Sequence, residues 1–264
     1  MDRRGTPQAP CLFEDARRQT RKRSNPRGRG MKIHVGTSGY AHKEWRGLFY
    51  PGDIDPKEML RFYGERLGAV EINYTFYHMP TREVLASWVK QVPSDFVFAL
   101  KTPQVITHRK RLKEVEQETD YFFRTIPALR DKLGAVLFQF PANFRANLPR
   151  LEDFLRLIPG NFRCAFEFRN PDWLEGGVTG LLESGGHCLC TADTDEAPLN
   201  DISGLANWGY LRLRRSNYTE GDLAEWAKRI RARNLEKCFV FFKHEEEAKG
   251  PGEALRFREL AALT

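Results

Sequence analysis

The sequence predicts a single (β/α)8 barrel, in which eight parallel strands alternate with helices. Eight short apolar runs carry this prediction, at residues 33–38, 69–73, 96–101, 135–140, 164–168, 188–193, 210–214 and 238–243. Most gaps between them are long enough for a helix and two turns, and such alternation predicts a parallel sheet. Eight units in about 230 residues fit a barrel, whose usual size is about 250 residues. Most runs end in a polar or charged residue, and barrels of this kind work at the carboxyl ends of their strands.

Helix signals fill most of the gaps. The predicted helices cover residues 56–67, 81–91, 114–132, 148–158, 219–234 and 252–263. The first has Asp55 as its N-cap, Pro56 at its first position and Gly68 just past its end, which is the usual order of capping residues. Pro127 predicts a break in the third. After residue 193 the gap is short and contains Pro198, so the sixth unit is predicted to be weak or irregular.

Composition places the chain among soluble proteins with a large core. Of its 264 residues, 41% are hydrophobic and 12% aromatic. No stretch approaches the run of about 18 apolar residues that a membrane span needs. The five cysteines are odd in number and form no CxxC pair, so we interpret them as small buried side chains in a reducing cytoplasm.

Residues 1–30 hold most of the net charge of +7 and are predicted to be a disordered tail before a barrel domain at 31–264. This segment is poor in apolar residues and rich in Arg, Gly and Pro. It lacks the apolar core of a secretory signal. Three interpretations stay open: translation starts at Met31, the tail has no function, or it is a basic arm that binds nucleic acid.

Several motifs resemble one known family. GTSGY (36–40), VEINYTFYHMP (70–80), FALKTPQVITHRKRL (98–112), AFEFRNPDW (165–173) and FVFFKHE (239–245) are similar to the YecE-like family, also called domain of unknown function 72. The resemblance covers residues 33–260 and implies a TIM barrel, related loosely by fold to sugar isomerases and abasic-site enzymes, with no established activity. Many members carry two asparagines where this chain has Lys243 and His244, and His-Gly where it has Arg214 and Arg215.

Charged residues at the strand ends define the predicted site. Side chains alternate along a strand, so Glu71 shares a face with Asn73, and Glu167 with Arg169. A charge on the outer face would be buried under helices at a cost of several kcal/mol if unpaired, so these side chains are predicted to face the barrel lumen or its mouth. Residues at a similar level on other strands are Lys101, Gln139, Asp193, Arg212 and Lys243. The alternative is that these charges only neutralise one another.

Each residue type suggests a role. Glu71, Glu167 and Asp193 are predicted catalytic carboxylates suited to acid/base work. Lys101 is either a clamp for an anion or a lysine that forms a Schiff base. Arginines hold carboxylates or phosphates through two hydrogen bonds. The predicted substrate-binding residues are Asn73, Tyr77, Gln139, Arg169, Trp173, Arg212, Lys243 and His244. The aromatic residues among them either stack on a ligand or cap the barrel as a small core.

Metal chemistry and several enzyme classes have little support. Histidines are few and show no HxH or HxxxH spacing, which argues against a trinuclear zinc centre. A single Mg or Mn ion on Glu71, Glu167, Asp193 and His244 is the metal hypothesis, and a site without metal is preferred. The chain has no Walker A, GxGxxG, GxSxG or HExxH motif, so ATPase, Rossmann and serine-hydrolase functions are disfavoured.

Three functions follow as hypotheses. The first is an isomerase, lyase or hydrolase that uses acid/base chemistry on a polyhydroxylated anionic small molecule, such as a sugar phosphate. The second is a protein that binds nucleic acid or processes abasic sites through the tail or the basic loop at His108–Arg111. The third is a ligand sensor with the same pocket and no turnover. The sequence indicates no oligomeric state.

Overall fold

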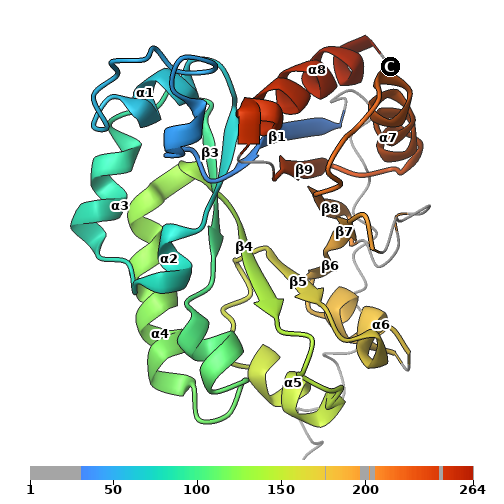
Figure 1. Ribbon diagram of the computed structural model, residues 1–264. Helices are drawn as coiled ribbons and strands as arrows, with labels where there is room; N and C mark the ends of the chain where they lie inside the picture. The colour runs from blue at the N-terminus through green and yellow to red at the C-terminus, as the bar shows by residue number, and fades with distance from the viewer. Residues whose placement is uncertain (1–30, 176, 197–201, 203–205, 244–245, 264) are drawn as a thin grey trace, which may run out of the picture. The chain divides into compact units, whose positions relative to one another are not determined.

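Nine parallel strands form a nearly closed barrel in a computed structural model that describes residues 31–175, 177–196, 202, 206–243 and 246–263 (Figure 1). The predicted tail at 1–30 lies outside the described residues. The strands are β1 Lys32–Ser38, β2 Ala69–Ile72, β3 Val97–Lys101, β4 Leu133–Phe140, β5 Cys164–Phe168, β6 Cys188–Leu189, β7 Thr191–Asp193, β8 Trp208–Leu213 and β9 Lys237–Phe242. Each of the eight predicted strands is present, and the predicted α/β barrel is confirmed.

The sixth predicted strand is divided at Cys190. β6 pairs with β5, β7 pairs with β8, and only Cys190 separates the two short strands. The Cys190 N–H donates a hydrogen bond of 2.8 Å to the carbonyl of Phe166 on β5, so the chain continues along the barrel wall between them. The helix expected after this strand falls largely in residues 197–205, where only Ile202 is described.

Helices surround the barrel close to their predicted positions. They are α1 Met59–Gly64, α2 Tyr74–Tyr77, α3 Arg82–Val89, α4 Glu116–Thr125, α5 Leu148–Leu155, α6 Val178–Ser184, α7 Glu220–Ala232 and α8 Lys249–Leu263. α1 begins three residues later than the predicted Pro56, and α8 begins before the predicted Gly252. The segment predicted as 114–132 divides into α4 and the 3-10 helix η4 (Ile126–Lys132), because Pro127 cannot continue the α-helical hydrogen bonds.

Side-chain caps fix several helix starts. Thr81 accepts a hydrogen bond from the Val84 N–H at the start of α3, as its predicted N-cap role requires. At α7, Thr219 and Asp222 form a reciprocal capping box. The short helices α2 and α6 were not predicted, and α2 directly follows β2 at the carboxyl end of the barrel.

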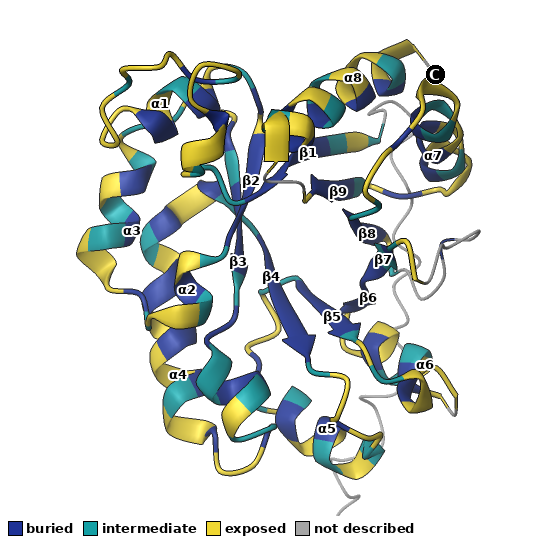
Figure 2. Ribbon diagram, in the orientation of Figure 1, coloured by how far each residue is buried: buried dark blue, intermediate teal, exposed yellow. Residues whose placement is uncertain are grey.

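Small side chains on one side of the barrel and large ones on the other fill the lumen. Strand residues that face inward on β2 to β5 are mostly alanines, whereas those on β8 and β9 are aromatic. Large side chains from one wall therefore fill the space that small ones leave on the other, as dense packing requires. The alanines are Ala69, Ala99, Ala135 and Ala165, and the aromatic residues are Trp208, Tyr210, Phe239 and Phe241. Figure 2 shows the strands buried and the helices exposed on their outer faces.

The cysteines and the helices agree with the composition. Cys164, Cys188, Cys190 and Cys238 are buried and unpaired, and burial raises the pKa of each thiol. They are therefore protonated packing residues, as interpreted from the sequence. None of the helices in the described part of the chain combines the length and the apolar character that crossing a membrane demands.

Candidate site at the barrel mouth

Two layers of polar side chains close the carboxyl end of the barrel. In the lower one Ser38 pairs with Glu71 and Gln139 pairs with Glu167, and the Arg212 side chain joins the two pairs. We call the lower set the buried layer; it consists of Ser38, Glu71, Gln139, Glu167 and Arg212. All five side chains are buried and lie above the packed lumen. They come at or near the ends of the apolar runs, so they lie where the apolar core ends.

The upper layer is basic. It consists of Asn73, Lys101, Arg169, Arg214 and Lys243. Asn73, Arg169 and Arg214 lie two residues beyond Glu71, Glu167 and Arg212, whereas Lys101 ends β3 and Lys243 follows β9. Exposure increases around this layer: the side chain of Arg214 is 14% exposed and that of Arg169 46%. The two layers together hold five cations and two carboxylates, so the mouth has a net charge of +3. An excess of positive charge over a polar floor favours an anion.

Arg212 joins the two predicted carboxylates. Its Nη2 lies 2.9 Å from Glu71 Oε1 and its Nη1 lies 2.5 Å from Glu167 Oε2. The side chains of all three residues are at most 3% exposed. Burial would lower the pKa of Arg212, but the two carboxylates raise it well above its ordinary value, so the guanidinium stays charged.

Glu71 has its hydrogen-bonding capacity largely satisfied within the protein. Ser38 Oγ donates to Glu71 Oε1 at 2.7 Å, and the Tyr210 hydroxyl donates to Oε2 at 2.7 Å. Burial and the neighbouring Glu71 charge raise the pKa of Tyr210, which keeps the phenol protonated as a donor. Glu71 therefore accepts hydrogen bonds from three donors. It is a structural anchor of the site and has little capacity left to bind a ligand.

Glu167, in contrast, has a free acceptor. Among the described residues no hydrogen bond reaches Glu167 Oε1, although Arg214 Nη2 lies 3.5 Å and Arg169 Nε 3.6 Å away. Arg212 Nε is likewise a buried donor without a hydrogen bond. Burial would raise the pKa of Glu167, but the charges of Arg212 and Arg214 lower it to about 2. The carboxylate is thus ionised at neutral pH, and a buried group left unsatisfied calls for a ligand or water.

Lys101 lies in the upper layer without an acidic partner. Its Nζ is 4.0 Å from the centroid of the Phe76 ring, and among the described residues its ammonium makes no hydrogen bond or ion pair. Burial and the charge of Arg212 lower the pKa of Lys101 to about 8, and the attraction of the two nearby carboxylates offsets only part of this. Its amine is therefore able to exchange protons close to neutral pH.

His108, which the sequence assigned to a basic loop, is a neighbour of Lys101 at the mouth. It lies in the π-helix η3 (Val105–Arg109) after β3, packs edge-on against Phe76 at 4.8 Å and shares a hydrogen bond with Thr107. Burial and the charges of Lys101 and Arg169 lower the pKa of His108 to about 4, so the ring is neutral. Single π-helical turns often mark functional sites.

Other members that sequence reasoning missed were within its reach. Ser38 ends a predicted strand, and Tyr210 and Arg214 lie two residues on either side of Arg212. The same alternation that selected Arg212 therefore places both at the lumen face. His108 was predicted only as part of the basic loop His108–Arg111, because the position of its ring depends on the path of that loop.

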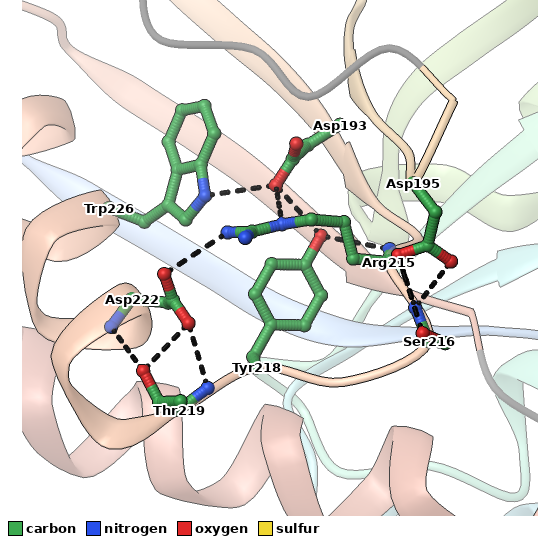
Figure 3. Close-up of polar contacts among 8 residues, drawn as sticks. All are labelled: Asp193, Asp195, Arg215, Ser216, Tyr218, Thr219, Asp222 and Trp226. Atoms are coloured by element: carbon green, nitrogen blue, oxygen red, sulfur yellow. Dashed lines mark hydrogen bonds and ion pairs between the residues drawn. The ribbon is translucent and has the colours of Figure 1, made fainter.

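Asp193 does not belong to the mouth, and the prediction that it lies with Glu71 and Glu167 is wrong. β7 pairs Asp193 with Leu213, whereas the inward-facing Arg212 pairs with Ala192, so Asp193 faces the helices. One oxygen, Oδ2, accepts hydrogen bonds from Arg215 Nε at 2.8 Å, Tyr218 OH at 3.0 Å and Trp226 Nε1 at 3.2 Å (Figure 3). These donors stabilise a charge that would otherwise be costly on the outer face.

This Asp193 cluster positions the upper layer indirectly. The Arg214 N–H donates to the backbone carbonyl of Asp193 at 2.8 Å, while Arg215 is bound by the Asp193 side chain. Arg215 Nη2 also reaches Asp222 at 3.5 Å, next to the cap of α7. The backbone at Arg214 is thereby fixed by its own hydrogen bond and by the anchored side chain of Arg215 next to it. This orients the Arg214 guanidinium toward Glu167.

We expect Asp193→Asn to lower the free energy of unfolding by about 1.5–3 kcal/mol, because a buried charge-assisted network loses its anion. Urea denaturation measures this loss. The matched control is Asp195→Asn, an exposed carboxylate that binds the Ser216 N–H at 2.9 Å in the same view. A change at an exposed surface position is usually within about 0.5 kcal/mol. Equal losses in the two variants would show that the Asp193 cluster adds no stability of its own.

The predicted aromatic contacts divide between core and rim. Trp173 is 1% exposed, stacks on Phe168 at 4.3 Å and donates its Nε1–H to the carbonyl of Phe144. It forms part of a small core rather than a ligand-stacking surface, as do the buried Trp45 and Tyr50. Tyr77 in α2 is 65% exposed, so it is accessible at the rim.

A metal site is not assembled from the predicted ligands. Within the described residues, no three His, Cys, Asp or Glu side chains gather as a metal-binding group. Asp193 lies on the opposite strand face, His244 is outside the described residues, and Arg212 occupies the space between Glu71 and Glu167. A divalent cation placed there would compete with that guanidinium.

A cavity of about 300 Å³ lies at the other end of the barrel. It is lined by the start of β4 and by Arg130, Phe162 and Arg163, which precede β4 and β5. None of the predicted site residues lines it. We place the candidate site at the carboxyl ends of the strands, because within the described residues this end holds a buried carboxylate oxygen that accepts no hydrogen bond and a lysine that forms no ion pair.

Comparison with known proteins agrees with this fold. Residues 34–264 match the sequence profile of a family described as a protein of unknown function, DUF72. YecE of Escherichia coli K12 is 30% identical over 146 residues, 55% of this chain and 51% of YecE. YunF of Bacillus subtilis 168 is 30% identical over 150 residues, 53% of this chain and 52% of YunF. The aligned segment thus spans about half the length of these curated relatives.

Solved structures extend the likeness over most of the chain. A DUF72 family protein from Thermotoga maritima superposes with a TM-score of 0.77 at 25% identity, covering 88% of this chain and 99% of that one. A DUF72 family protein from Enterococcus faecalis gives a TM-score of 0.71 at 19% identity, over 88% of this chain and 96% of that one. The second likeness concerns the fold alone.

Proposed function

The chain belongs to the DUF72 family, and because the family description gives no activity, we propose a function from the mouth itself. The site binds an anionic, polyhydroxylated small molecule and carries out acid/base chemistry on it. The observation that supports this most directly is the combination of a basic upper layer with a buried carboxylate oxygen, Glu167 Oε1, that has no hydrogen bond among the described residues.

The two layers suit two parts of such a ligand. Guanidinium groups at Arg169 and Arg214 bind a phosphate or carboxylate through paired hydrogen bonds. Beneath them, Glu167 and Gln139 offer acceptors and an amide for hydroxyl groups. A site built to hydrogen-bond hydroxyls rejects analogues that lack them, because its polar groups would remain unpaired.

Glu167 and Lys101 have different roles in the proposed proton transfers. Glu167, with a pKa of about 2, is ionised at neutral pH and cannot act as the acid, so we assign it as an acceptor and base. Lys101, with a pKa of about 8, is the group closest to neutrality and supplies or receives the second proton. Glu71 holds Arg212 and Tyr210 in place. This arrangement suits an isomerase or a lyase better than a hydrolase.

A thermal-shift screen tests the proposal. The panel contains sugar phosphates, sugar acids, nucleotides and an abasic oligonucleotide, each with and without Mg, Mn or Zn. A ligand at about 100 times its Kd adds roughly 2.7 kcal/mol, which raises the Tm of a domain this size by about 2–4 °C or more. We expect a sugar phosphate or sugar acid to give such a shift, and Glu167→Gln and Arg169→Ala to abolish it.

The matched control is Arg156→Ala, which removes an exposed arginine paired with Glu152 and Asp153 on the helix side. It should keep the shift. Loss of the shift in Arg156→Ala as well would contradict specific binding at the mouth. A shift with the abasic oligonucleotide alone would support the nucleic-acid hypothesis, and ligand binding without turnover would support the sensor hypothesis.

A further inference from the structure

The surroundings of Lys101 are unusual for a lysine beside two carboxylates. Glu71 and Glu167 both affect its pKa, yet neither forms an ion pair with it. Arg212 binds Glu71 Oε1 and Glu167 Oε2, and the ammonium instead lies over the Phe76 ring at 4.0 Å. The ammonium thus has a cation–π contact, which stabilises its charge less than a close ion pair with a carboxylate would.

Two nearby arginines oppose a positive charge on Lys101. Arg212 lies below it, and Arg169 belongs to the same layer. The adjacent His108 is neutral, because burial and the charges of Lys101 and Arg169 lower its pKa to about 4. Burial near other cations is a recognised way to make a lysine amine nucleophilic, since it favours the neutral form that carries the lone pair.

We propose that Lys101 is a nucleophile that captures the carbonyl carbon of an anionic aldehyde or ketone as an imine. The proposal rests on the proposed binding of an anionic ligand at the mouth; it specifies the ligand class and gives Lys101 a covalent role in place of proton transfer. In the balanced step, the Nζ lone pair attacks the carbonyl carbon, and the carbonyl oxygen leaves as water with two protons from the starting ammonium. The product is an iminium ion with one C=N bond and an unchanged overall charge.

The rest of the site fits this step. Arg169 and Arg214 are placed to hold the anionic group of the ligand, and Glu167 Oε1 faces the same space as a base. An iminium ion acidifies the adjacent C–H, so an ionised carboxylate with a free oxygen is the partner that isomerase or lyase chemistry needs. Asn73, at the start of α2, lies in the same layer and provides an amide.

Reductive labelling tests the proposal. The full chain is treated at pH 7 with glyoxylate, a small anionic aldehyde, and sodium cyanoborohydride, and labelled lysines are quantified by peptide mass spectrometry. A pKa of about 8 makes the neutral fraction about 300-fold larger than for an ordinary lysine. Lower basicity offsets part of this gain, so we expect Lys101 to react at least about tenfold faster than the exposed Lys57 and Lys90.

The variants and a second probe complete the design. Lys101→Arg keeps the charge and should lose the fast-reacting site, whereas the matched Lys57→Arg should keep it. Formaldehyde, a neutral aldehyde, should label Lys101 with a smaller preference, because it lacks the anion. Labelling of Lys101 no faster than of Lys57 by either probe overturns the proposal, whatever the ligand screen shows. Fast labelling of Lys101 together with an unresponsive screen would support the nucleophile and count against the anionic ligand.

Discussion

Replacing Arg212 with methionine is expected to lower the free energy of unfolding by about 3–5 kcal/mol at pH 7.5. Arg212 is buried between Glu71 and Glu167, and its removal takes away the shared cation and leaves only the longer contacts of Arg214 and Arg169 to Glu167. Methionine keeps much of the volume, so the loss measures the charge rather than a cavity. Urea denaturation followed by tryptophan fluorescence gives the value.

The pH dependence separates this cause from a general packing defect. In the native protein the pKa of Glu167 is about 2, below its unfolded value of 4.5, so the ion pair contributes stability above pH 4.5 and loses it as pH falls toward 2. Arg212→Met removes the cation that contributes most to the low pKa of Glu167, so the deficit relative to the native protein should shrink as the pH falls from 7.5 toward 4. The triple variant Glu71→Gln, Glu167→Gln, Arg212→Met should recover part of it. A deficit that stays constant with pH would contradict the charge argument.

The second large effect is expected at Gly36 on β1. A Cβ at this position would lie 1.8 Å from the carbonyl oxygen of Ala69 and 3.0 Å from the Tyr63 hydroxyl. The obstacle is backbone of the adjoining strand, which cannot rotate away, so β1 and β2 must separate where Gly36 pairs with Ala69. We expect Gly36→Ala to cost about 3 kcal/mol or more, or to prevent folding.

The matched control is Gly180→Ala in α6, where a Cβ meets nothing within 4 Å. Alanine is favoured over glycine within a helix, so this variant should gain about 0.5–1 kcal/mol. If Gly36→Ala fails to fold, its soluble yield and near-UV circular dichroism against Gly180→Ala still test the prediction. Native-like stability in Gly36→Ala would show that the strands part without penalty.

The strands could be predicted because burial on both faces makes each one a continuous apolar run. Helix positions followed from capping residues and proline, and the errors at α1 and α8 are errors of boundaries. α2 was missed because four residues give too little periodicity to recognise. The division at Cys190 left no trace in the sequence, because it depends on how two neighbouring strands pair.

Prediction of the site was wrong for Asp193, because it required knowing which residues of the strand face the lumen. Residues 188–193 contain a charge at their end like other strands, but Asp193 lies one position out of step with Arg212 across β7 and β8. The argument that an outer charge is too costly assumed no partner there. Tyr218 and Trp226 supply one from a later part of the chain, and only the folded structure brings them near.

Because the lumen is packed with side chains, the mouth opens only at the carboxyl end of the barrel. Aromatic side chains from β8 and β9 fill the barrel below the buried layer, so Tyr210 and Phe241 form a floor whose height limits how far a ligand can descend. The charges that we propose to select the ligand lie on other strands, at Glu167 and Lys101. Under the proposed function, depth and charge are therefore separable properties of this barrel, and a substitution at a floor residue such as Phe241 would change the ligand length while the basic upper layer is kept.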